Sequence, residues 1–424
     1  MKVAIVTQYY KSKNYGGNLQ AYAMCKAVEK YGYEAEQLCF PLKTYKLGAF
    51  PVKKGKKVLE EIKIAIHILG YRILTFRRGR IARRLIKKRE QSVLSFNQNL
   101  IPHSAEVYNE LDMKASTEKY GVFITGSDMV WSPDLFSPIF TLDFVPSCTP
   151  KFSYAPSMGT TALNDNIRET FREFLKDYQA VSVRESGSVS ALTDLAPVPV
   201  EWVLDPTLIL DRTEWDAISS TALIDKPYLF CYFLGSNSDS RKAAQAYAKK
   251  HNLTLVTIPY LRDAYRSCDW KFGDIQLSDV SPSDFISLIR YSAAVFTDSF
   301  HACVFSFLYQ REMFAFRRNE NDKWGVRICS FLKLIGYPLR YCDTDEKECM
   351  QYIESLPKID YHAPFADIEM MKKKSLDYLE KKGVHSGTKI SGFSCARLEE
   401  QIRKDFEDIA WVSCERKGTL LRVR

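Results

Sequence analysis

The stretch "AAVFTDSFHACVFSFL" (Ala293–Leu308) decides the fold, because it joins an apolar strand to an apolar helix through a short polar corner. A short apolar run that ends in a polar turn is typical of a buried strand. The residues after His301 are almost all apolar and suit a buried helix. Asp298, Ser299 and His301 therefore lie where a strand passes into a helix. Ligands of open parallel α/β sheets bind at the carboxyl ends of strands, so this corner predicts both an α/β fold and a functional site.

The same alternation of strand, polar loop and helix runs through the rest of the chain. In the first half, the apolar runs that we expect to be strands are Lys2–Thr7, Gly121–Gly126, Lys151–Ala155 and Ala180–Arg184. The alternation restarts after a boundary near residues 204–215, with expected strands at Pro227–Gly235, Leu253–Ile258, Ala293–Thr297 and Glu312–Phe316. Repeated units of this kind form doubly wound parallel sheets. We predict an α/β fold with two Rossmann-like, doubly wound domains that face a cleft, a GT-B-like arrangement.

The predicted domains are residues 1–212, which include a basic helical insert at 56–98, and residues 217–345. Residues 346–385 are expected to form C-terminal helices, and residues 386–424 form a tail of unknown role. From Pro51 to Glu90 the chain has 14 Lys or Arg and three Glu, a difference of +11 that exceeds the net charge of +9. The insert is either a solvated helix face or a peripheral contact with an anionic membrane. No recognition motif accompanies it, so we predict no nucleic-acid partner.

Composition and cysteine usage indicate the compartment. Hydrophobic residues make up 46% of the chain, which is ordinary for a globular protein with sizeable cores. The N-terminal residues "MKVAIVTQYY" suit a first strand rather than a signal peptide, and no apolar run is long enough to cross a membrane. The 11 cysteines are odd in number and contain no CxxC pair. We therefore predict a reduced, cytoplasmic protein, with peripheral contact at the inner face of the membrane as the open alternative.

Two loops of the first predicted domain carry small and polar residues at strand ends. Asn14, Gly16 and Gly17 follow the first strand, where glycines would let backbone N–H groups approach a ligand, or would simply make a tight turn. Ser127 and Asp128 follow the strand "GVFIT". Asp128 could accept a proton or hold a sugar hydroxyl, and both residues also suit a helix N-cap.

Cationic residues and one histidine complete the candidate site. Arg184 ends a strand, and its fork of donors matches a carboxylate or a phosphate. Arg318 and Arg327 could add charge for a phosphate in the second domain. His301 can donate or accept a proton near pH 7, and Asp298 is close enough in sequence to orient it. No His, Cys and Asp cluster has the spacing of metal ligands, so we predict no metal.

Six motifs, taken in order, resemble the polysaccharide pyruvyl transferases over about residues 1–340. They are "NYGGNLQAYA", "FITGSDMVWSPD", "FVPSCTPKFSYAPSMG", "VSVRE", "VEWVLDPTLIL" and "TDSFHACVFSF". The resemblance implies transfer of the enolpyruvyl unit of phosphoenolpyruvate onto a sugar of a surface polysaccharide or its lipid-linked precursor, as a pyruvate ketal. The partners would be phosphoenolpyruvate, a donor substrate that needs no cofactor, and a glycan acceptor. Arg184 matches the family's phosphoenolpyruvate-binding arginine, and His301 matches the family histidine.

The chain also departs from the family pattern, and this leaves roles open. Ser299 stands where better-known members have arginine, and Ala302 where they often have glycine. Arg318 or Arg327 could supply the missing charge. We assign His301 as the acid and Asp128 or Asp298 as the base. Two alternatives remain: a nucleotide-sugar-dependent glycosyltransferase of GT-B type, and a non-catalytic glycan-binding member of the family.

Overall fold

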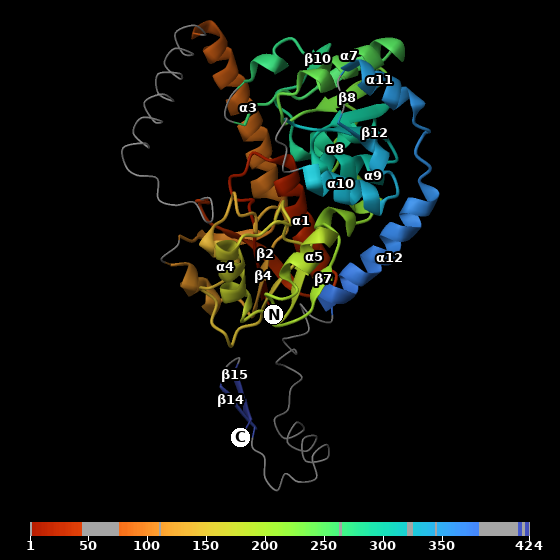
Figure 1. The fold of residues 1–424 in the computed structure, drawn as a ribbon. Helices are drawn as coiled ribbons and strands as arrows, with labels where there is room; N and C mark the ends of the chain where they lie inside the picture. The colour runs from red at the N-terminus through yellow and green to blue at the C-terminus, as the bar shows by residue number, and fades with distance from the viewer. Residues whose placement is uncertain are drawn as a thin grey trace, which may run out of the picture.

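The computed structural model describes residues 2–44, 76–109, 112–262, 265–319, 325–343, 346–380, 414–417 and 420–423. It contains two parallel sheets, one in each half of the chain, flanked by helices (Figure 1). The prediction of an α/β fold with two Rossmann-like domains is confirmed. Most of the insert's first half and of the C-terminal tail lies outside the described residues.

The sheet of the first domain is built on the N-terminal strand. Its parallel strands lie in the order β3-β2-β1-β4-β5. They are β1 (Lys2–Val6), β2 (Glu34–Cys39), β3 (His103–Val107), β4 (Val122–Thr125) and β5 (Lys151–Ser153). A parallel pair, β6 (Val181–Val183) and β7 (Val200–Trp202), continues the sheet through a bridge between Phe152 and Ala180. β1 and β4 are almost wholly apolar because helices or loops cover both faces of a central parallel strand.

Short helices connect these strands. They are α1 (Tyr15–Glu29), η1 (Met113–Glu118), η2 (Pro138–Thr141), α4 (Asp165–Leu175) and α5 (Ser186–Leu192). The amide of Ile167 donates to the Asn164 side chain and so caps the start of α4. Two further short helices, η3 (Pro206–Leu208) and α6 (Arg212–Asp216), lead to the second domain.

The sheet of the second domain repeats the same plan in the order β10-β9-β8-β11-β12-β13. Its strands are β8 (Tyr228–Tyr232), β9 (Thr254–Thr257), β10 (Ile275–Gln276), β11 (Ala294–Thr297), β12 (Glu312–Phe316) and β13 (Tyr341–Cys342). Its helices are α7 (Ser238–Lys250), η4 (Ser267–Asp269), α8 (Pro282–Arg290), α9 (Phe300–Leu308), α10 (Gly325–Leu334), η5 (Pro338–Arg340) and α11 (Glu346–Ser355). β8 and β11 are neighbours at the centre of this sheet. The order continues from β8 to β9 and β10 on one side, and from β11 to β12 and β13 on the other. The carboxyl ends of β8 and β11 therefore mark the switch point where ligands bind in such sheets.

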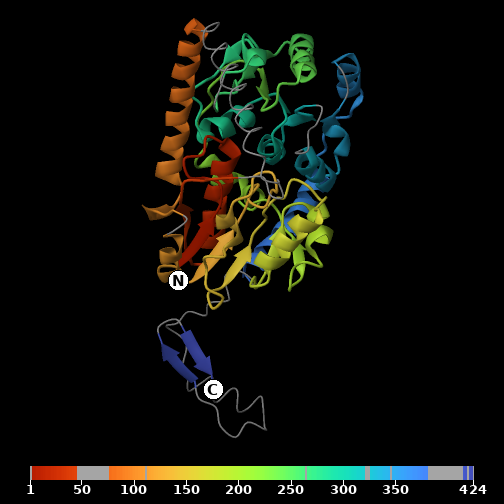
Figure 2. The same ribbon diagram turned by 60° about the vertical axis from the view of Figure 1, so that its left-hand side comes forward.

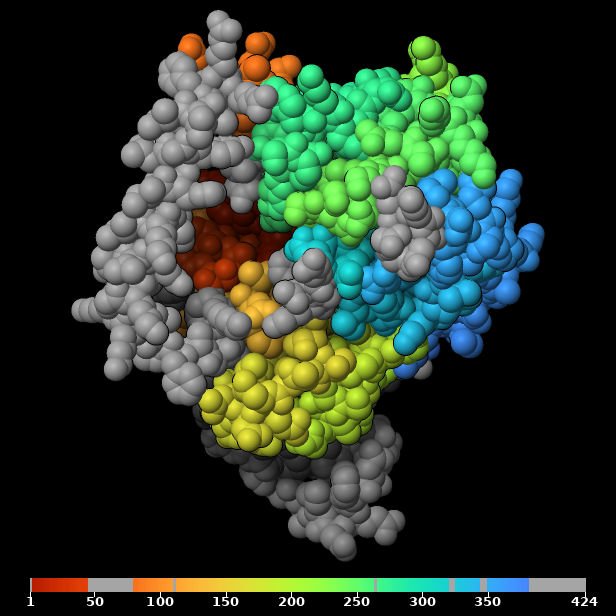
Figure 3. All heavy atoms as spheres, turned by 45° about the horizontal axis from the view of Figure 1, so that its top comes forward, coloured from red at the N-terminus to blue at the C-terminus, as the bar shows by residue number. Residues whose placement is uncertain are grey.

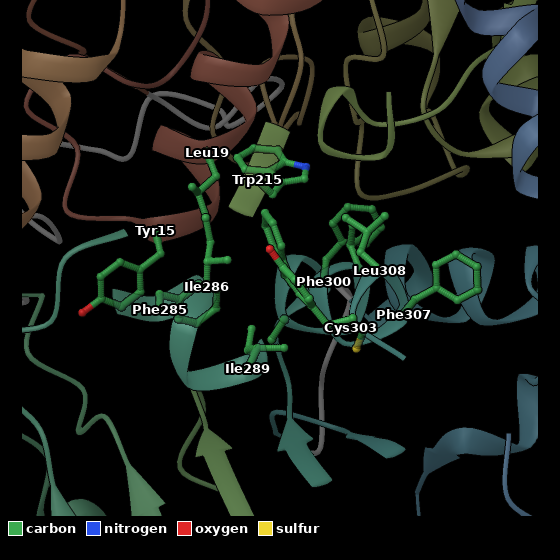
Figure 4. Close-up of a cluster of buried hydrophobic side chains, with 14 of the residues drawn as sticks. Tyr15, Leu19, Trp215, Phe285, Ile286, Ile289, Phe300, Cys303, Phe307 and Leu308 are labelled. Atoms are coloured by element: carbon green, nitrogen blue, oxygen red, sulfur yellow. The ribbon is translucent and has the colours of Figure 1, made fainter. Parts of the chain in front are cut away.

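An apolar core joins the two domains where the sequence predicted a cleft. Tyr15 of α1 stacks on Phe285 of α8 with ring centroids 5.0 Å apart (Figure 4). Trp215 meets Phe305 of α9 edge-on at 4.9 Å. These side chains belong to one buried cluster with members from both domains. The domains therefore face each other as predicted, but their contact is largely filled with side chains.

One further helix ties the domains together. α12 (His362–Tyr378) runs from the second domain back to the first, as Figure 1 shows. There the hydroxyl of Ser375 accepts from the amide of Leu204, and Tyr378 donates its hydroxyl to the carbonyl of Ser153. Within the predicted segment 346–385, the described residues 346–380 contain α11 and α12.

The long helix α3 (Phe76–Leu100) is the described part of the predicted insert 56–98. It lies along the outer edge of the molecule in both ribbon views (Figures 1 and 2). In the tail 386–424, the described residues form an antiparallel hairpin of β14 (Cys414–Lys417) and β15 (Leu420–Val423). None of the helices formed by the described residues is both long and apolar enough to span a membrane.

Candidate active site

The candidate site lies where the two domains meet at the carboxyl ends of their sheets. His301 is in the first turn of α9, directly after β11. Arg184 follows β6, and Ser127 and Asp128 follow β4. In the space-filling view, first-domain residues drawn in red lie at the floor of a hollow that second-domain residues drawn in green border on one side (Figure 3). Strand-end loops of both domains therefore supply the site, as the sequence predicted.

Gly16 lies against the imidazole of His301. A Cβ atom on Gly16 would come within 2.0 Å of Nδ1 of His301. Gly17 is less crowded, because its nearest neighbour would be the carbonyl oxygen of Gln8 at 3.2 Å. Asn14 precedes α1 at the N-cap position, although its side chain makes no capping hydrogen bond. The His301 ring thus leaves no room for a side chain at position 16, and the expected contact of this loop with a ligand stays a prediction.

Asp205 is the carboxylate beside His301, and sequence reasoning missed its role. Its Oδ2 atom lies 3.7 Å from Nε2 of His301 and accepts a 2.7 Å hydrogen bond from Nη1 of Arg184. Its Oδ1 atom accepts from the amide and the hydroxyl of Thr207 at 3.0 and 2.6 Å. Burial alone would raise the pKa of Asp205, but His301, Arg184 and Thr207 together hold it below its usual range. The "LDP" of the quoted "VEWVLDPTLIL" was the available signal.

Arg184 is fully enclosed and surrounded by acidic side chains. Its Nε donates to Oε1 of Glu185 at 3.2 Å, and its guanidinium lies 4.5 Å from the ring centre of Phe300 in the second domain. Burial would lower the pKa of Arg184, but the charges of Glu185, Asp205 and Asp128 raise it above its usual value. Arg184 is therefore a fixed cation at the interface of the domains, as an anion-binding role requires.

Asp128 lies between two arginines without bonding closely to either. Its Oδ1 atom is 3.8 Å from Nη2 of Arg184 and 3.8 Å from Nη1 of Arg327. Its backbone has a φ of +61°, which few residues other than glycine adopt. Burial and the nearby charges of Arg184 and Arg318 lower the pKa of Arg327 to about 10. Arg327 is thus a buried cation with too little compensating negative charge, and an anionic ligand would stabilise it.

Ser127, which precedes Asp128, forms hydrogen bonds with other parts of the protein. Its hydroxyl donates to the carbonyl of Ala155 at 2.7 Å and lies 3.3 Å from Oδ2 of Asp205. Its amide donates to the side chain of Gln20. Ser127 therefore helps to hold Asp205 in place, and its predicted contact with substrate stays a prediction.

Asp298 is tied to the backbone of its own domain. Its Oδ1 and Oδ2 atoms accept from the amides of Leu234 and Gly235 at 2.7 and 2.6 Å. Nη2 of Arg318 donates to the carbonyl of Asp298 at 3.1 Å, and burial raises the pKa of the Asp298 carboxyl. Both carboxylate oxygens of Asp298 therefore bind the loop that follows β8, and its expected roles, orienting His301 or acting as the base, stay predictions. The carboxylate of Asp205 also lies beside the His301 ring, 3.7 Å from Nε2.

Ser299 is at the N-cap position of α9, but its side chain makes no capping hydrogen bond. Ser299 is buried, lies two positions before His301 in the sequence and carries no charge. The positive charge of the described site therefore comes from Arg184, Arg318 and Arg327, as the sequence suggested for the missing arginine. No group of three His, Cys, Asp or Glu in the described part of the chain could hold a metal ion.

Three buried nitrogen atoms of this site have no hydrogen-bond partner among the described residues. They are Nη2 of Arg184, Nε of Arg327 and Nε2 of His301. A buried polar atom without a partner costs roughly 1–3 kcal/mol, more when it is charged, so native structures rarely keep several together. Oε2 of Glu185, an acceptor, is in the same state. Arg184, Glu185, Asp205, Phe300 and Arg327 also line one pocket between the domains. The arrangement can hold an anion, and Oε2 of Glu185 is an unpartnered acceptor in the same site.

Comparison with known structures gives matches of low sequence identity. UDP-GlcNAc 2-epimerase from Methanocaldococcus jannaschii aligns with a TM-score of 0.48 at 8% identity, covering 88% of this chain and 100% of that one. UDP-GlcNAc 2-epimerase from Neisseria meningitidis, bound to UDP-GlcNAc, aligns with a TM-score of 0.44 at 11% identity, covering 90% and 100%. The calicheamicin glycosyltransferase CalG4 gives 0.40 at 10% identity, covering 97% and 99%.

Comparison of the sequence gives the family. No curated protein matches the sequence significantly. Residues 14–320, most of the chain, match the family described as polysaccharide pyruvyl transferase. The matched range contains each strand-end loop that contributes to the candidate site, from Asn14 to Arg318, and stops before Arg327. The chain therefore belongs to the polysaccharide pyruvyl transferase family.

Proposed function

We propose that this protein transfers the enolpyruvyl unit of phosphoenolpyruvate onto a sugar of a surface polysaccharide or its lipid-linked precursor, forming a pyruvate ketal. The observation that carries the proposal is the set of unpartnered buried nitrogens of Arg184, Arg327 and His301. Phosphoenolpyruvate brings a phosphate and a carboxylate, and each needs a fixed cation. A single anion with two charged groups would give all three nitrogens a partner.

The reaction requires one proton donor near the methylene carbon of phosphoenolpyruvate. Protonation of that carbon leaves an oxocarbenium-like centre at C2, which a sugar hydroxyl attacks with loss of its proton. The bond between C2 and the phosphate oxygen then breaks, and a second hydroxyl attacks C2 to close the ketal while its proton passes to the departing phosphate. His301 is our candidate for the donor, because its imidazole is a proton carrier at neutral pH and Nε2 has no partner. Asp205 beside Nε2 would stabilise the protonated ring.

The proton of the attacking hydroxyl needs an acceptor. Asp128 remains a candidate, since its Oδ1 atom is beyond hydrogen-bonding distance from both arginines, at 3.8 Å. Glu185 is a second candidate, because its Oε2 atom is buried without a partner while Oε1 accepts from Ser157 at 2.6 Å. Both carboxylates lie within reach of Arg184 and hence near the proposed donor.

Asp298 argues against the nucleotide-sugar alternative. A diphosphate at the switch point of the second domain would use backbone amides at the ends of β8 and β11. The amides of Leu234 and Gly235, just after β8, already donate to the Asp298 carboxylate. Because these two amides already have an acceptor, they are not available to a diphosphate. The non-catalytic alternative is separated by the experiment that follows.

Calorimetry and phosphate release test the proposal together. The full-length protein should bind phosphoenolpyruvate, and it should release phosphate only when an acceptor glycan is present. His301→Ala should keep the far-ultraviolet circular dichroism spectrum and bind phosphoenolpyruvate, but lose at least about 100-fold in phosphate release. Absence of phosphoenolpyruvate binding in the wild type would reject the proposal. Binding without turnover on any acceptor would favour the non-catalytic alternative, and turnover of His301→Ala within threefold of wild type would remove His301 from the chemistry.

A further inference from the structure

The C-terminal half of α3 is anchored on the loop that follows β1. Arg89 is 1% exposed, donates from Nε to the hydroxyl of Tyr15 at 3.1 Å and from Nη2 to the carbonyl of Lys13 at 3.2 Å. Asn97 donates to the carbonyl of Tyr9 at 3.1 Å. Tyr15 also contacts the second domain, where its hydroxyl donates to the carbonyl of Val280. This half of α3 therefore supports the strand-end loop from which Gly16 meets His301.

The N-terminal half of α3 has the opposite character. From Phe76 to Arg89 the helix contains basic and apolar residues but no acidic residue. Its exposed basic side chains are Arg80, Arg83, Arg84, Lys87 and Lys88. Lys88 approaches Asp279 at 3.8 Å, and Nε of Arg83 donates to a carbonyl of its own helix. Ile81, among these cations, is 49% exposed.

This basic half projects from the body of the molecule. In both ribbon views the beginning of α3 extends past the neighbouring second domain (Figures 1 and 2). A flat partner could therefore reach it without displacing other described elements. Concentrated positive charge on a projecting helix favours a flat anionic partner, because each cation can approach the partner's charge at once.

We propose that residues 79–88 of α3 dock this protein on an anionic membrane surface. Lipid headgroups supply the complementary charge, and the exposed Ile81 suits the boundary between headgroups and acyl chains. A nucleic acid would match the charge, but it would leave Ile81 without an apolar environment. The docking rests on charge and exposure alone. Its purpose rests on the proposed function, since it would bring the site towards an acceptor held at the membrane.

Vesicle co-sedimentation of the full-length protein tests this docking. Vesicles of phosphatidylcholine with phosphatidylglycerol should bind the protein at low salt, pure phosphatidylcholine vesicles should not, and ~0.5 M salt should release it because exposed charges are screened. The test variant carries Arg80→Gln, Arg83→Gln, Arg84→Gln and Lys87→Gln. Each basic residue near an anionic surface contributes roughly fivefold to partitioning, so the variant should lose about 100-fold or more.

A matched control removes the same charge from other surfaces. It carries Lys114→Gln, Lys249→Gln, Lys373→Gln and Lys374→Gln, which are exposed residues outside α3. Both variants lower the net charge by four, so a difference between them reports position and not total charge. Retained binding in the control would support the docking. Equal loss in both variants, binding to neutral vesicles, or no binding at low salt would overturn it.

Two further measurements keep the docking apart from the proposed function. Phosphate release with a soluble acceptor should be the same in wild type and test variant, because the four changed residues lie outside the site. If phosphoenolpyruvate is not bound but vesicles are, the proposed function fails and the docking stands. If single-stranded RNA competes with anionic vesicles at equal charge concentration and binds more tightly, the surface recognises nucleic acid and the membrane proposal is wrong.

Discussion

Gly16 and His301 touch across the domain interface so closely that a Cβ atom on the glycine would lie 2.0 Å from Nδ1 of the imidazole. The glycine belongs to the first turn of α1 in the first domain, and the histidine to the first turn of α9 in the second. Under 3 Å no relaxed arrangement exists, so either the ring or the helix must move. The contact thus couples the placement of His301 to the packing of the two domains.

Gly16→Ala should displace the His301 ring and lower phosphate release by about tenfold or more, since small misplacements of catalytic groups are costly. Phosphoenolpyruvate binding by Arg184 and Arg327 should change less than turnover. The matched control is Gly79→Ala in α3, a helical glycine whose Cβ atom would meet no atom within 4 Å. Steady-state kinetics of both variants check the prediction. Wild-type turnover in Gly16→Ala would show that the position of the ring does not matter.

Arg184→Lys should raise the KM for phosphoenolpyruvate nearly as much as Arg184→Ala, by about tenfold or more. A lysine ammonium cannot bond Glu185 and Asp205 and still offer a donor to a ligand, whereas the arginine fork bonds both carboxylates and leaves Nη2 without a partner. Arg340→Lys is the control, because Arg340 is also buried, pairs with Glu312 and lies 4.5 Å from the ring centre of Phe314. The control should lose stability without a change in KM. Full rescue of KM by lysine at position 184 would mean that only long-range charge matters there.

Asp205→Asn should destabilise the protein at neutral pH, by roughly 3–5 kcal/mol if it behaves as other broken buried ion pairs do. The pKa of Asp205 is lowered in the folded state, so its carboxylate stabilises the fold above the unfolded pKa of about 3.9. That contribution is lost as the pH falls below this value towards the folded pKa. The difference in the free energy of unfolding between wild type and variant should therefore be constant from pH 7 to about 5 and shrink below about 4.

Urea denaturation at several pH values measures this difference. The exposed Asp194, which pairs with Arg168 at the surface, provides Asp194→Asn as a control with little expected effect. A difference for Asp205→Asn that stays constant down to pH 3.5, or grows in acid, would contradict the assigned direction of the pKa shift. If phosphate release at pH 7 is lost without a loss of stability, Asp205 acts on His301 and does not contribute to the stability of the fold.

The strands formed by apolar runs could be predicted from the sequence. All eight strands expected from apolar runs are present, because central strands of parallel sheets are buried on both faces and must be apolar. Strands with polar positions were missed, such as β2, "EAEQLC", and β3, "HSAEV". β3 is an edge strand with one buried residue out of five, so its burial does not require an apolar pattern in the sequence.

The sequence by itself determined the two-domain α/β plan, the family, and the presence of Arg184, Asp128, His301 and Arg327 at strand ends or on nearby helices. Only the tertiary structure decided the partners of these residues. It placed His301 beside Asp205, 96 positions earlier by their residue numbers, and tied Asp298 to the backbone that follows β8. It also packed α1 of the first domain against α8 and α9 of the second. The pattern of apolar residues is a local property that can be read from the residue order, whereas the pairing of charged side chains depends on how the two folded sheets bring distant strand ends together.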